Sequence, residues 1–430
     1  MKKAALHNLG CKVNAYETEA MQQMLEAAGY EIVPFNEPAD VYVVNTCSVT
    51  NMADRKSRQM LHKAKKNNPD SIVVATGCYV QTSEQEALED LSIDIVIGNN
   101  RKHELVSLIE EFAKDNVFDI NHEKQEFEEL FVSQTAEHTR AFIKVQDGCN
   151  QFCSYCIIPY ARGRVRSRKL ENVIDEVMRL ASNGYKEVVL TGIHLSSYGV
   201  DFEDKTDLLA LIQAVNRVDG IERIRLGSLE PKIVTEEFAS ALSQMPKVCP
   251  HFHLSLQSGC DATLKRMNRR YTAEEYENGC RLLRKYFEHP AITTDVIVGF
   301  PGESDEEFEI TKQFLKKIHF YEMHIFKYSK RKGTRAAVMQ DQVAEQIKTG
   351  RSAELISLGN EMSDEFRMYY TGKIKNVLFE EKVEINGKSY YTGYTKEYVK
   401  VAKESEETLE NQIIEGKITG RLTDDIYIMR

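Results

Sequence analysis

The chain has 430 residues, of which 42% are hydrophobic and 28% are charged, and its formal net charge is −10. No apolar run reaches the ~18–20 residues of a membrane helix, and the first residues lack the apolar core of a signal peptide, so we expect a cytoplasmic protein with no membrane partner. The acidic balance disfavours a simple nucleic-acid coat protein, although local basic groups leave RNA binding open.

Residues 1–115 are predicted to form an α/β domain with an open parallel sheet. The apolar runs are short and rich in Val and Ile, as in strands that are buried on both faces. Helical stretches lie between these runs, which is the alternation of a layered α/β structure. The expected strands are Ala4–Leu9, Glu31–Phe35, Val41–Val44, Ile72–Ala75 and Ile93–Ile97, and the expected helices include Glu17–Ala28 and Asp54–Lys66.

Three cysteines of this domain share one local context. Cys11, Cys47 and Cys78 each follow an apolar strand and each precede a loop and a helix. Residues just past the carboxyl ends of neighbouring parallel strands meet in one crevice, so the three sulfurs are predicted to face one another, within roughly 5–8 Å. The alternative is three buried structural cysteines, because free cysteine packs as a small hydrophobe. An odd total of nine cysteines in a long chain favours reduced thiols or metal ligands over disulfides.

Residues 116–138 carry many charges without a clear period and are predicted to be a linker. The alternation of strands and helices resumes in residues 139–369. Six consecutive β/α units predict an incomplete parallel barrel with its chemistry at the C-terminal ends of the strands. The expected strands are Ala141–Gln146, Glu187–Thr191, Arg223–Leu229, His251–Leu256, Thr293–Val298 and Met323–Tyr328. The expected helices are Glu171–Asn183, Asp207–Val218, Thr235–Gln244, Ala273–Tyr286, Asp305–Ile318 and Gln342–Tyr370.

The most informative motif follows the first of these strands. Cys149, Cys153 and Cys156 are spaced Cys-x-x-x-Cys-x-x-Cys and supply three thiolates without a fourth ligand. A structural zinc site and a ferredoxin-type 4Fe-4S cluster each take four ligands. Three thiolates on a four-iron cluster leave one iron open to a substrate or cofactor, while half of a zinc site stays an alternative on this motif alone. The remaining cysteines share no such context and are expected to be core thiols: Cys249, Cys260 and Cys280.

Several basic groups offer local positive fields to a polyanion. One cluster of basic residues is usually just a solvated surface. Three such clusters near the ends of predicted barrel strands, taken together, favour a functional role. The first comprises Arg162, Arg164, Arg166, Arg168 and Lys169, the second Lys265, Arg266, Arg269 and Arg270, and the third Lys327, Lys330, Arg331, Lys332 and Arg335.

Residues 370–430 are predicted to form a small β-barrel, because short alternating strands are separated by glycines. The expected strands are Lys375–Phe379, Tyr390–Tyr394 and Tyr398–Val401, and the punctuating glycines are Gly387, Gly393, Gly416 and Gly420. From Gly372 onward there are ten Lys and Arg against eleven Asp and Glu, so the tail is not basic. If the tail binds RNA, a local cluster of basic residues or its tyrosines must make the contact. The alternative role for these tyrosines is packing between the strands.

The motifs together resemble the radical S-adenosylmethionine (SAM) methylthiotransferase family over essentially the whole chain. The segments that carry the resemblance are NLGCKVNAYETE, VNTCSVT, ATGC, CNQFCSYCIIPYARGRVRSR, LTGIHLSSYG, HLSLQSG with MNRRYT, and TDVIVGFPGES. The resemblance implies an N-terminal methylthiotransferase domain, a radical SAM core built as a partial (β/α) barrel, and a C-terminal RNA-binding TRAM domain.

The resemblance also implies two 4Fe-4S clusters. Cys149, Cys153 and Cys156 would ligate the cluster that binds SAM, and Cys11, Cys47 and Cys78 would ligate an auxiliary cluster that holds the added sulfur. One electron would cleave SAM to methionine and a deoxyadenosyl radical, which opens the C–H bond at carbon 2 of an adenine. An electron donor and a sulfur source are the partners that this chemistry requires.

Family members differ in their substrate. The segments CIIPYARGRVRSR and GIHLSSYG look most like the bacterial branch that acts on threonylcarbamoyladenosine in tRNA. Isopentenyladenosine in tRNA and an aspartate of a ribosomal protein are the alternatives within the family. A non-catalytic, metal-sensing RNA-binding protein is a remote alternative, because a binding module needs no six-unit barrel.

Strand ends supply the expected ligand contacts. Glycine there lets the backbone approach a ligand, although an ordinary turn at Gly299 and an exposed carboxylate at Glu230 are the plain alternatives. The arginines after the cysteine motif are expected to face the barrel mouth and to meet tRNA phosphates or the threonyl carboxylate. The expected SAM contacts are Thr191, Gly192, Ser228, Glu230, Gln257 and Gly299, and the expected substrate contacts are Arg162, Arg164, Arg166 and Arg168.

Overall fold

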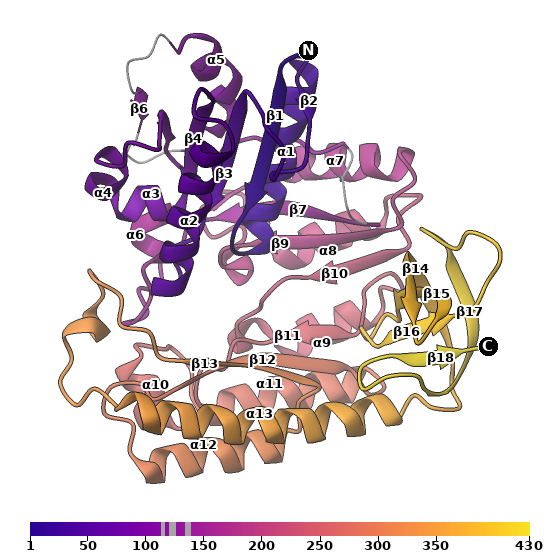
Figure 1. Cartoon of the computed structure of the whole chain (residues 1–430). Helices are drawn as coiled ribbons and strands as arrows, with labels where there is room; N and C mark the ends of the chain where they lie inside the picture. Colours follow the sequence, from indigo (N-terminus) through magenta and orange to yellow (C-terminus); the bar gives the residue numbers. More distant parts are fainter. Residues whose placement is uncertain (113–116, 120–125, 134–138) are drawn as a thin grey trace.

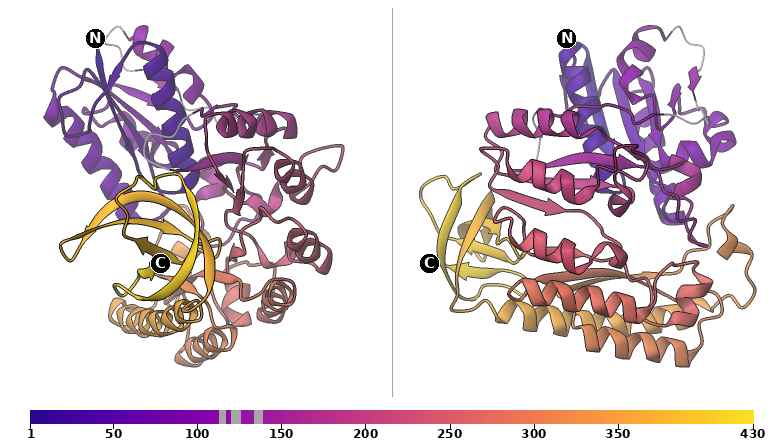
Figure 2. Two further views of the ribbon diagram at one scale, coloured as in Figure 1. Left: turned by 90° about the vertical axis from the view of Figure 1, so that its right-hand side faces the viewer. Right: turned by 180° about the vertical axis from the view of Figure 1, so that it is seen from behind.

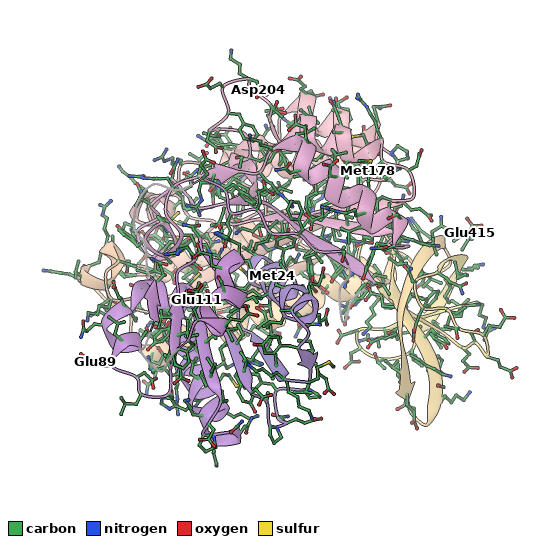
Figure 3. The ribbon with its side chains drawn as sticks, turned by 90° about the horizontal axis from the view of Figure 1, so that it is seen from above. Met24, Glu89, Glu111, Met178, Asp204 and Glu415 are labelled. Atoms are coloured by element: carbon green, nitrogen blue, oxygen red, sulfur yellow. The ribbon has the colours of Figure 1, made fainter. Side chains whose placement is uncertain are left out.

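The computed structural model describes residues 1–112, 117–119, 126–133 and 139–430. The chain forms three parts in sequence order: an N-terminal sheet, a curled core and a C-terminal β-barrel (Figure 1). Figure 3 shows the same parts from above, with Glu111 on the first, Met178 on the second and Glu415 on the third. Among the described residues, no helix combines the length and the apolarity needed to cross a membrane.

The N-terminal part is a parallel six-stranded sheet in the order β2-β1-β3-β4-β5-β6, which confirms the predicted open sheet. Its strand β6 falls within the predicted linker, most of which lies outside the described residues. The strands are β1 Lys3–Asn8, β2 Glu31–Ile32, β3 Val41–Thr46, β4 Ile72–Gly77, β5 Ile95–Ile97 and β6 Val117–Asp119. The helices are α1 Lys12–Ala27, α2 Asn51–Asn67, α3 Cys78–Thr82, α4 Glu84–Leu88, η1 Lys102–Glu104 and α5 Leu105–Glu110.

The core contains the six predicted parallel strands in two hydrogen-bonded groups, β10-β9-β7-β8 and β11-β12-β13. Isolated parallel bridges, Ile224 with Val248 and Leu229 with Leu254, join the groups into one curled half-barrel. The short β8 pairs antiparallel with β7 and was not predicted. The strands are β7 Arg140–Asp147, β8 Arg166–Ser167, β9 Glu187–Gly192, β10 Arg223–Leu226, β11 His251–His253, β12 Ala291–Val298 and β13 Glu322–Lys327.

The helices of the core cover the outside of this half-barrel (Figures 1 and 2). Two of them, α11 and α12, have the predicted bounds, and each begins with a capping box, at Thr272 and at Ser304, that satisfies free N–H groups of the first turn. The helices are α6 Ile158–Arg162, α7 Leu170–Ser182, η2 Leu195–Ser197, α8 Leu208–Asn216, η3 Pro231–Ile233, α9 Glu236–Ser243, α10 Asp261–Arg266, α11 Ala273–Tyr286, α12 Asp305–Ile318, η4 Arg335–Val338 and α13 Glu345–Met368.

The alternation of side chains along β7 shows what occupies the inner face of the half-barrel. Ile143 and Val145 are buried in the large core cluster with the outer helices. The intervening Lys144 points the other way and binds Glu17 of α1, with 2.7 Å between Nζ and Oε1. Helix α1 therefore lies against the inner face, and its N-terminus brings residues of the first domain into the half-barrel.

The C-terminal part is a closed barrel in the order β14-β15-β16-β18-β17, which confirms the predicted small β-barrel. Its first turn is a two-residue hairpin at Asn386 and Gly387, whose φ values of 53° and 76° suit the twist of the flanking strands. Two glycines expected between strands, Gly416 and Gly420, lie inside β17 instead. The strands are β14 Ile374–Ile385, β15 Lys388–Tyr394, β16 Lys400–Lys403, β17 Ile413–Arg421 and β18 Tyr427–Met429.

Candidate active site with two cysteine triads

The first triad lies along one edge of the N-terminal sheet. Cys11 is the N-cap residue of α1, Cys47 follows β3, and Cys78 opens α3 directly after β4. The strands β1, β3 and β4 are neighbours, and the register pairs the last residues of each with those of the next. The three cysteines thus follow adjacent carboxyl ends, where an open parallel sheet binds ligands.

Two glycines let the triad approach closely. Gly10 has a φ of 110°, and a Cβ at this position would lie 2.9 Å from the Cys47 sulfur. Gly77 has a φ of 97°, and its Cβ would lie 2.4 Å from the Thr46 carbonyl oxygen. Both positions need a residue without a side chain, for the backbone angle and for the space.

A chain of polar contacts links two of the sulfurs. The Cys11 Sγ lies 3.8 Å from the Asn14 Oδ1, which also accepts a hydrogen bond from the Arg162 Nη2 at 2.6 Å. The Arg162 Nε donates to the Cys78 Sγ at 3.4 Å. One guanidinium therefore contacts the Cys78 sulfur directly and Cys11 through Asn14, and it comes from α6 of the core. The separation of roughly 5–8 Å between the sulfurs stays a prediction.

The chemistry of these donors fits a three-ligand cluster. Crowding by the surrounding protein raises the pKa of Cys11, and burial raises the pKa of Cys47 to about 11, so without a metal these thiols hold their protons at neutral pH. A soft metal centre displaces those protons and removes the penalty of burying a charged sulfur. Three sulfurs without a fourth thiol match a 4Fe-4S cluster with one open iron.

The second triad occupies the loop between β7 and α6. Its backbone is folded on itself, because the Cys156 N–H donates to the Cys153 carbonyl at 3.0 Å. The Gln151 N–H points at the Cys149 sulfur at 3.4 Å, and the Arg269 Nη1 donates to the Cys153 sulfur at 3.1 Å. These donors are set to stabilise thiolate sulfur, which is the form that binds iron.

Burial raises the pKa of Cys149 to about 11 and that of Cys156 to about 12. The neighbouring thiol of Cys153 contributes to both shifts, because thiolates repel one another. Three mutually repelling sulfurs in one short loop fit a shared multinuclear metal centre.

Glu230, one of the predicted SAM contacts, is tied to this loop. Its Oε1 lies 3.0 Å from the Arg269 Nη2 and 3.3 Å from the His194 Nε2. Although burial opposes ionisation, the His194 hydrogen bond and the Arg269 charge together lower the pKa of Glu230. The structure thus links Glu230 to the Cys153 sulfur through a single arginine.

The other predicted SAM contacts lie at strand ends with different surroundings. Thr191 is buried, and a Cβ at Gly192 would lie 2.9 Å from the Gln146 Oε1. Ser228 is exposed. Gln257 has a left-handed φ of 71° and exchanges backbone hydrogen bonds with β12, its N–H donating to the Asp295 carbonyl at 2.8 Å.

Gly299 follows β12 with a φ of 70°. A Cβ at this position would lie 2.3 Å from the Lys348 Cγ of α13. The close packing of this helix therefore accounts for the glycine, so no ligand is needed to explain it.

The four arginines after the cysteine motif separate into two kinds. Arg162 and Arg168 are buried, at 2% and 0% exposure, in ion pairs with carboxylates of the chain. Their predicted contact with substrate does not fit this burial. Arg166 is buried as well, binding the Asn100 Oδ1 at 3.0 Å and lying 3.4 Å from the Asp147 Oδ2. Arg164 alone of the four is exposed, and it stacks over the Phe152 ring at 4.7 Å. A cavity of about 710 Å³ is lined by Arg162, Arg164, Arg166 and Lys169.

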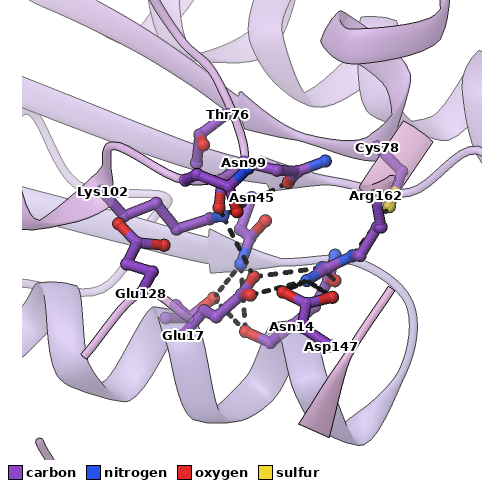
Figure 4. A network of polar contacts seen from close by, with 12 residues as sticks. Asn14, Glu17, Asn45, Thr76, Cys78, Asn99, Lys102, Glu128, Asp147 and Arg162 are labelled. Atoms are coloured by element: carbon purple, nitrogen blue, oxygen red, sulfur yellow. Dashed lines mark hydrogen bonds and ion pairs between the residues drawn. The ribbon is translucent and has the colours of Figure 1, made fainter. Parts of the chain in front are cut away.

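Arg162 belongs to a buried charged network between the first two parts of the chain (Figure 4). Its Nη1 lies 2.6 Å from the Glu17 Oε1 and 3.3 Å from the Asp147 Oδ2. Lys144 contacts the same two carboxylates, at 2.7 Å each, and Lys102 lies 3.4 Å from Glu17. Although burial opposes ionisation, the surrounding cations lower the pKa of both carboxyl groups.

A second arginine joins the core to the other side of the first triad. Arg331, from the segment after β13, pairs with Asp54 of α2, and its Nη2 donates to the Ser48 Oγ at 2.7 Å. Ser48 is the neighbour of Cys47 in sequence. In the second predicted basic group, Arg266 pairs with Glu307. Each of these two groups therefore has an arginine that is paired with a carboxylate of the same chain.

The sequence analysis missed a cluster of three polar side chains on the inner face of the half-barrel. His253, Asp295 and His324 come from the adjacent strands β11, β12 and β13, and their ligand atoms lie within 4.8 Å of one another. The His253 Nε2 is 3.3 Å from the Asp295 Oδ2. The signal that could have found it is the charged Asp295 among apolar residues of a buried strand.

Lys12 is another missed residue, one position after Cys11. It reaches solvent, yet the protein crowds it, and burial together with the charges of Arg225 and Arg140 lowers its pKa to about 8. Arg140 begins β7 and Arg225 lies within β10, and both alternate with residues that face the core, so Lys12 faces the inner side of the half-barrel. The three cysteines outside the triads are buried, as predicted: Cys249, Cys260 and Cys280.

Comparison with known proteins identifies two families in the chain. Residues 143–315 match the family described as the radical SAM superfamily, and residues 3–98 match one described as uncharacterized protein family UPF0004. The threonylcarbamoyladenosine tRNA methylthiotransferase of Bacillus subtilis (strain 168) is 42% identical over 423 residues, covering 97% of this chain and 94% of that protein. The tRNA-2-methylthio-N(6)-dimethylallyladenosine synthase of Pelotomaculum thermopropionicum is 36% identical over 430 residues, covering 98% and 96%.

Among solved structures, the radical S-adenosylmethionine methyltransferase TsrM from Kitasatospora setae has a TM-score of 0.57 and 17% identity. The likeness covers 79% of this chain and 77% of that one, and it concerns the fold. The full-length similarity to methylthiotransferases at 42% identity, together with the two cysteine triads, settles the family. The chain belongs to the radical SAM methylthiotransferases.

Proposed function

We propose that this protein is a tRNA methylthiotransferase that adds a methylthio group to carbon 2 of threonylcarbamoyladenosine next to the anticodon. Two observations together carry the proposal. The chain holds two three-cysteine sites, and Arg162, which follows the second of them in sequence, donates to a sulfur of the first. The chain is also 42% identical to a threonylcarbamoyladenosine enzyme over nearly the whole length. A tRNA substrate also makes a cytoplasmic location part of the proposal.

The proposal assigns a 4Fe-4S cluster and SAM to Cys149, Cys153 and Cys156, and a second 4Fe-4S cluster to Cys11, Cys47 and Cys78. When bound, these groups supply the electron that cleaves SAM and a site where sulfur is held for transfer. An external electron donor and a sulfur source complete the set of partners.

The chain's own residues orient the reactants. Glu230, in the segment after β10, forms an ion pair at 3.0 Å with Arg269, which also donates to the Cys153 sulfur, so a SAM amino group bound there would find a carboxylate. Helix α1 contacts β7 of the half-barrel through Glu17 and carries Cys11 at its N-terminus, which supports our proposal that the two triads face a common space. The ion pairs of Glu17, Asp147, Arg162 and Lys144 are buried at the joint between the domains.

Lys12 supports the choice of substrate. The threonyl group carries a carboxylate, which an isopentenyl group lacks, and Lys12 offers an inward-facing cation beside Cys11. For the tRNA backbone, the exposed Arg164 and Lys169 at the cavity edge are the phosphate contacts that we propose.

The test uses the reconstituted full-length enzyme under anaerobic conditions with SAM, a reductant and a sulfide source. Two tRNAs with the same anticodon arm are compared, one carrying threonylcarbamoyladenosine and one carrying isopentenyladenosine, and the nucleosides are measured by mass spectrometry. We expect the 2-methylthio product from the first tRNA. Product from the isopentenyl form alone would overturn the substrate, and product from neither would overturn the function.

The same assay separates the two triads. In Cys153→Ala, SAM cleavage should stop while about four irons remain at the auxiliary site. In Cys47→Ala, reductive SAM cleavage should continue without methylthio product. A Cys47→Ala enzyme that still made product would contradict a sulfur-holding role for the first triad.

A further inference from the structure

Arg162 has a place in the structure that its family motif does not explain. It ends α6, six residues after Cys156, and it is buried at 2% exposure. Its guanidinium crosses from the radical SAM core into the N-terminal part and ends beside the Cys78 sulfur, as Figure 4 shows. One side chain of the helix that follows the second triad thereby contacts a cysteine of the first.

The five N–H groups of this guanidinium can be assigned to partners one by one. The Nη1 donates to the Glu17 Oε1 at 2.6 Å and to Asp147 at 3.3 Å. The Nη2 donates to the Asn14 Oδ1 at 2.6 Å and to the Glu17 Oε2 at 3.1 Å. The remaining donor, Nε, is directed at the Cys78 sulfur, and a neutral thiol is a weak acceptor. The arrangement is satisfied fully only when that sulfur is a thiolate.

The charge of the network leads to the same conclusion. Three cations, Arg162, Lys102 and Lys144, face two carboxylates, Glu17 and Asp147, which leaves one positive charge in excess. Adding Arg166, which lies 3.4 Å from Asp147, and Glu128, which interacts with Lys102, contributes one charge of each sign and keeps the excess. A buried surplus charge is costly unless an opposite charge adjoins it.

We propose that Arg162 is a positioning residue for the auxiliary cluster: it holds Cys78 from across the domain joint and stabilises the cluster's negative charge. The inference rests on the auxiliary cluster of the proposed function. A nearby guanidinium and an N–H···S hydrogen bond stabilise the reduced, more negative form of an iron–sulfur cluster, so they raise its reduction potential. The potential is therefore a direct readout of the contact.

The experiment isolates the auxiliary cluster in the full-length chain. In a parent protein that combines Cys149→Ala, Cys153→Ala and Cys156→Ala, the first is the one cysteine triad that remains to hold a cluster. Arg162→Gln and Arg162→Lys are added to this parent, and the midpoint potential is measured by anaerobic spectroelectrochemistry beside the iron content. Arg168→Gln is the matched control, because Arg168 is equally buried, comes from the same arginine run and pairs with Glu129 and Glu176, not with a cysteine.

We expect Arg162→Gln to shift the midpoint potential to a more negative value, Arg162→Lys to shift it less in the same direction, and Arg168→Gln to leave it in place. Equal potentials in Arg162→Gln and the parent would overturn the inference, as would an equal shift in Arg168→Gln. If Arg162→Gln loses its iron, the same substitution in the wild-type background decides: loss of the auxiliary iron alone supports positioning, and loss of both clusters overturns it in favour of a general structural role. A parent without about four irons would overturn the auxiliary cluster of the proposed function instead.

Discussion

Arg269 donates a hydrogen bond from Nη1 to the Cys153 sulfur at 3.1 Å while its other terminal nitrogen pairs with Glu230. The guanidinium is thus shared between a sulfur of the second triad and a carboxylate at a strand end. Although burial opposes protonation, the acidic groups around Arg269 hold its pKa well above its usual range, so its charge is permanent.

We predict that Arg269→Gln slows reductive SAM cleavage by about tenfold or more, because a charge-assisted contact with the sulfur is lost, worth about 1.5–3 kcal/mol. The midpoint potential of the cluster on this triad should become more negative, for the electrostatic reason given for Arg162. Spectroelectrochemistry in a Cys11→Ala, Cys47→Ala and Cys78→Ala background measures it. An unchanged potential together with unchanged cleavage would contradict the role of Arg269.

Gly10→Ala should prevent the first triad from holding the cluster that we propose for it. The new methyl group would lie 2.9 Å from the Cys47 sulfur at a φ of 110°, so backbone strain and a clash with a ligand act together. Gly29→Ala is the matched control, since Gly29 also has a positive φ, of 86°, but no atom within 4 Å of the added carbon. We expect about four irons fewer in Gly10→Ala and the full content in Gly29→Ala, measured by iron analysis after anaerobic reconstitution. Full iron content in both variants would argue against the close packing of this triad.

Glu17→Gln should destabilise the joint between the domains. Removing one partner of a buried ion pair costs about 3–5 kcal/mol, because the cations of Arg162 and Lys144 lose their counter-charge. The pKa of Glu17 is lowered in the folded protein, so its stabilisation is complete above the ordinary carboxyl pKa of about 4.5 and is lost as the pH falls below that value.

Urea unfolding at pH 7.5 and at pH 4.0 checks this sign. The difference between wild type and Glu17→Gln should be large at pH 7.5 and smaller at pH 4.0. Glu26→Gln, an exposed substitution on the same helix, should change neither value by more than about 0.5 kcal/mol. A difference that grew on acidification would show that the carboxylate does not act as the paired anion.

Lys12→Gln should discriminate between the two tRNA substrates. If Lys12 binds the threonyl carboxylate, its loss lowers kcat/KM for threonylcarbamoyladenosine tRNA by about tenfold or more and leaves the isopentenyl form unaffected. Arg164→Ala is the contrasting variant: a phosphate contact weakens both tRNAs alike and makes the salt dependence of binding shallower by about one unit of slope. Equal losses on both tRNAs in Lys12→Gln would rule out carboxylate recognition by this residue.

The sequence predicted the strands and the order of the parts, because runs such as Val41–Thr46 are buried on both faces and carry their own signal. It missed the first turn of α1, which begins at Lys12 and not at Glu17. The reason is physical: Asn14 and Glu17 are polar but fully buried, so the apolar period of the helix is broken where the domain joint begins. Local pattern cannot show a partner that lies elsewhere.

The arginines show the same limit of prediction from local sequence. A charged residue is exposed by default, which is why Arg162 and Arg168 were expected to meet tRNA. The partner of Arg162 lies 145 positions away, at Glu17, and only the folded chain brings them together. The cysteines were easier to predict because strand ends, not pairwise contacts, determine where Cys11, Cys47 and Cys78 gather.

Helix α13 runs without interruption from the C-terminal ends of the core strands to the C-terminal barrel. Near its start, Lys348 donates to the Tyr328 carbonyl at 3.2 Å, and near its end the Phe366 ring stacks on Tyr321 at 4.3 Å. Its 24 residues span about 36 Å at 1.5 Å per residue. The length of the helix therefore sets the distance between the barrel and the strand ends. A nucleic acid that contacts both must span this distance, and a shorter stem-loop would contact only one of them.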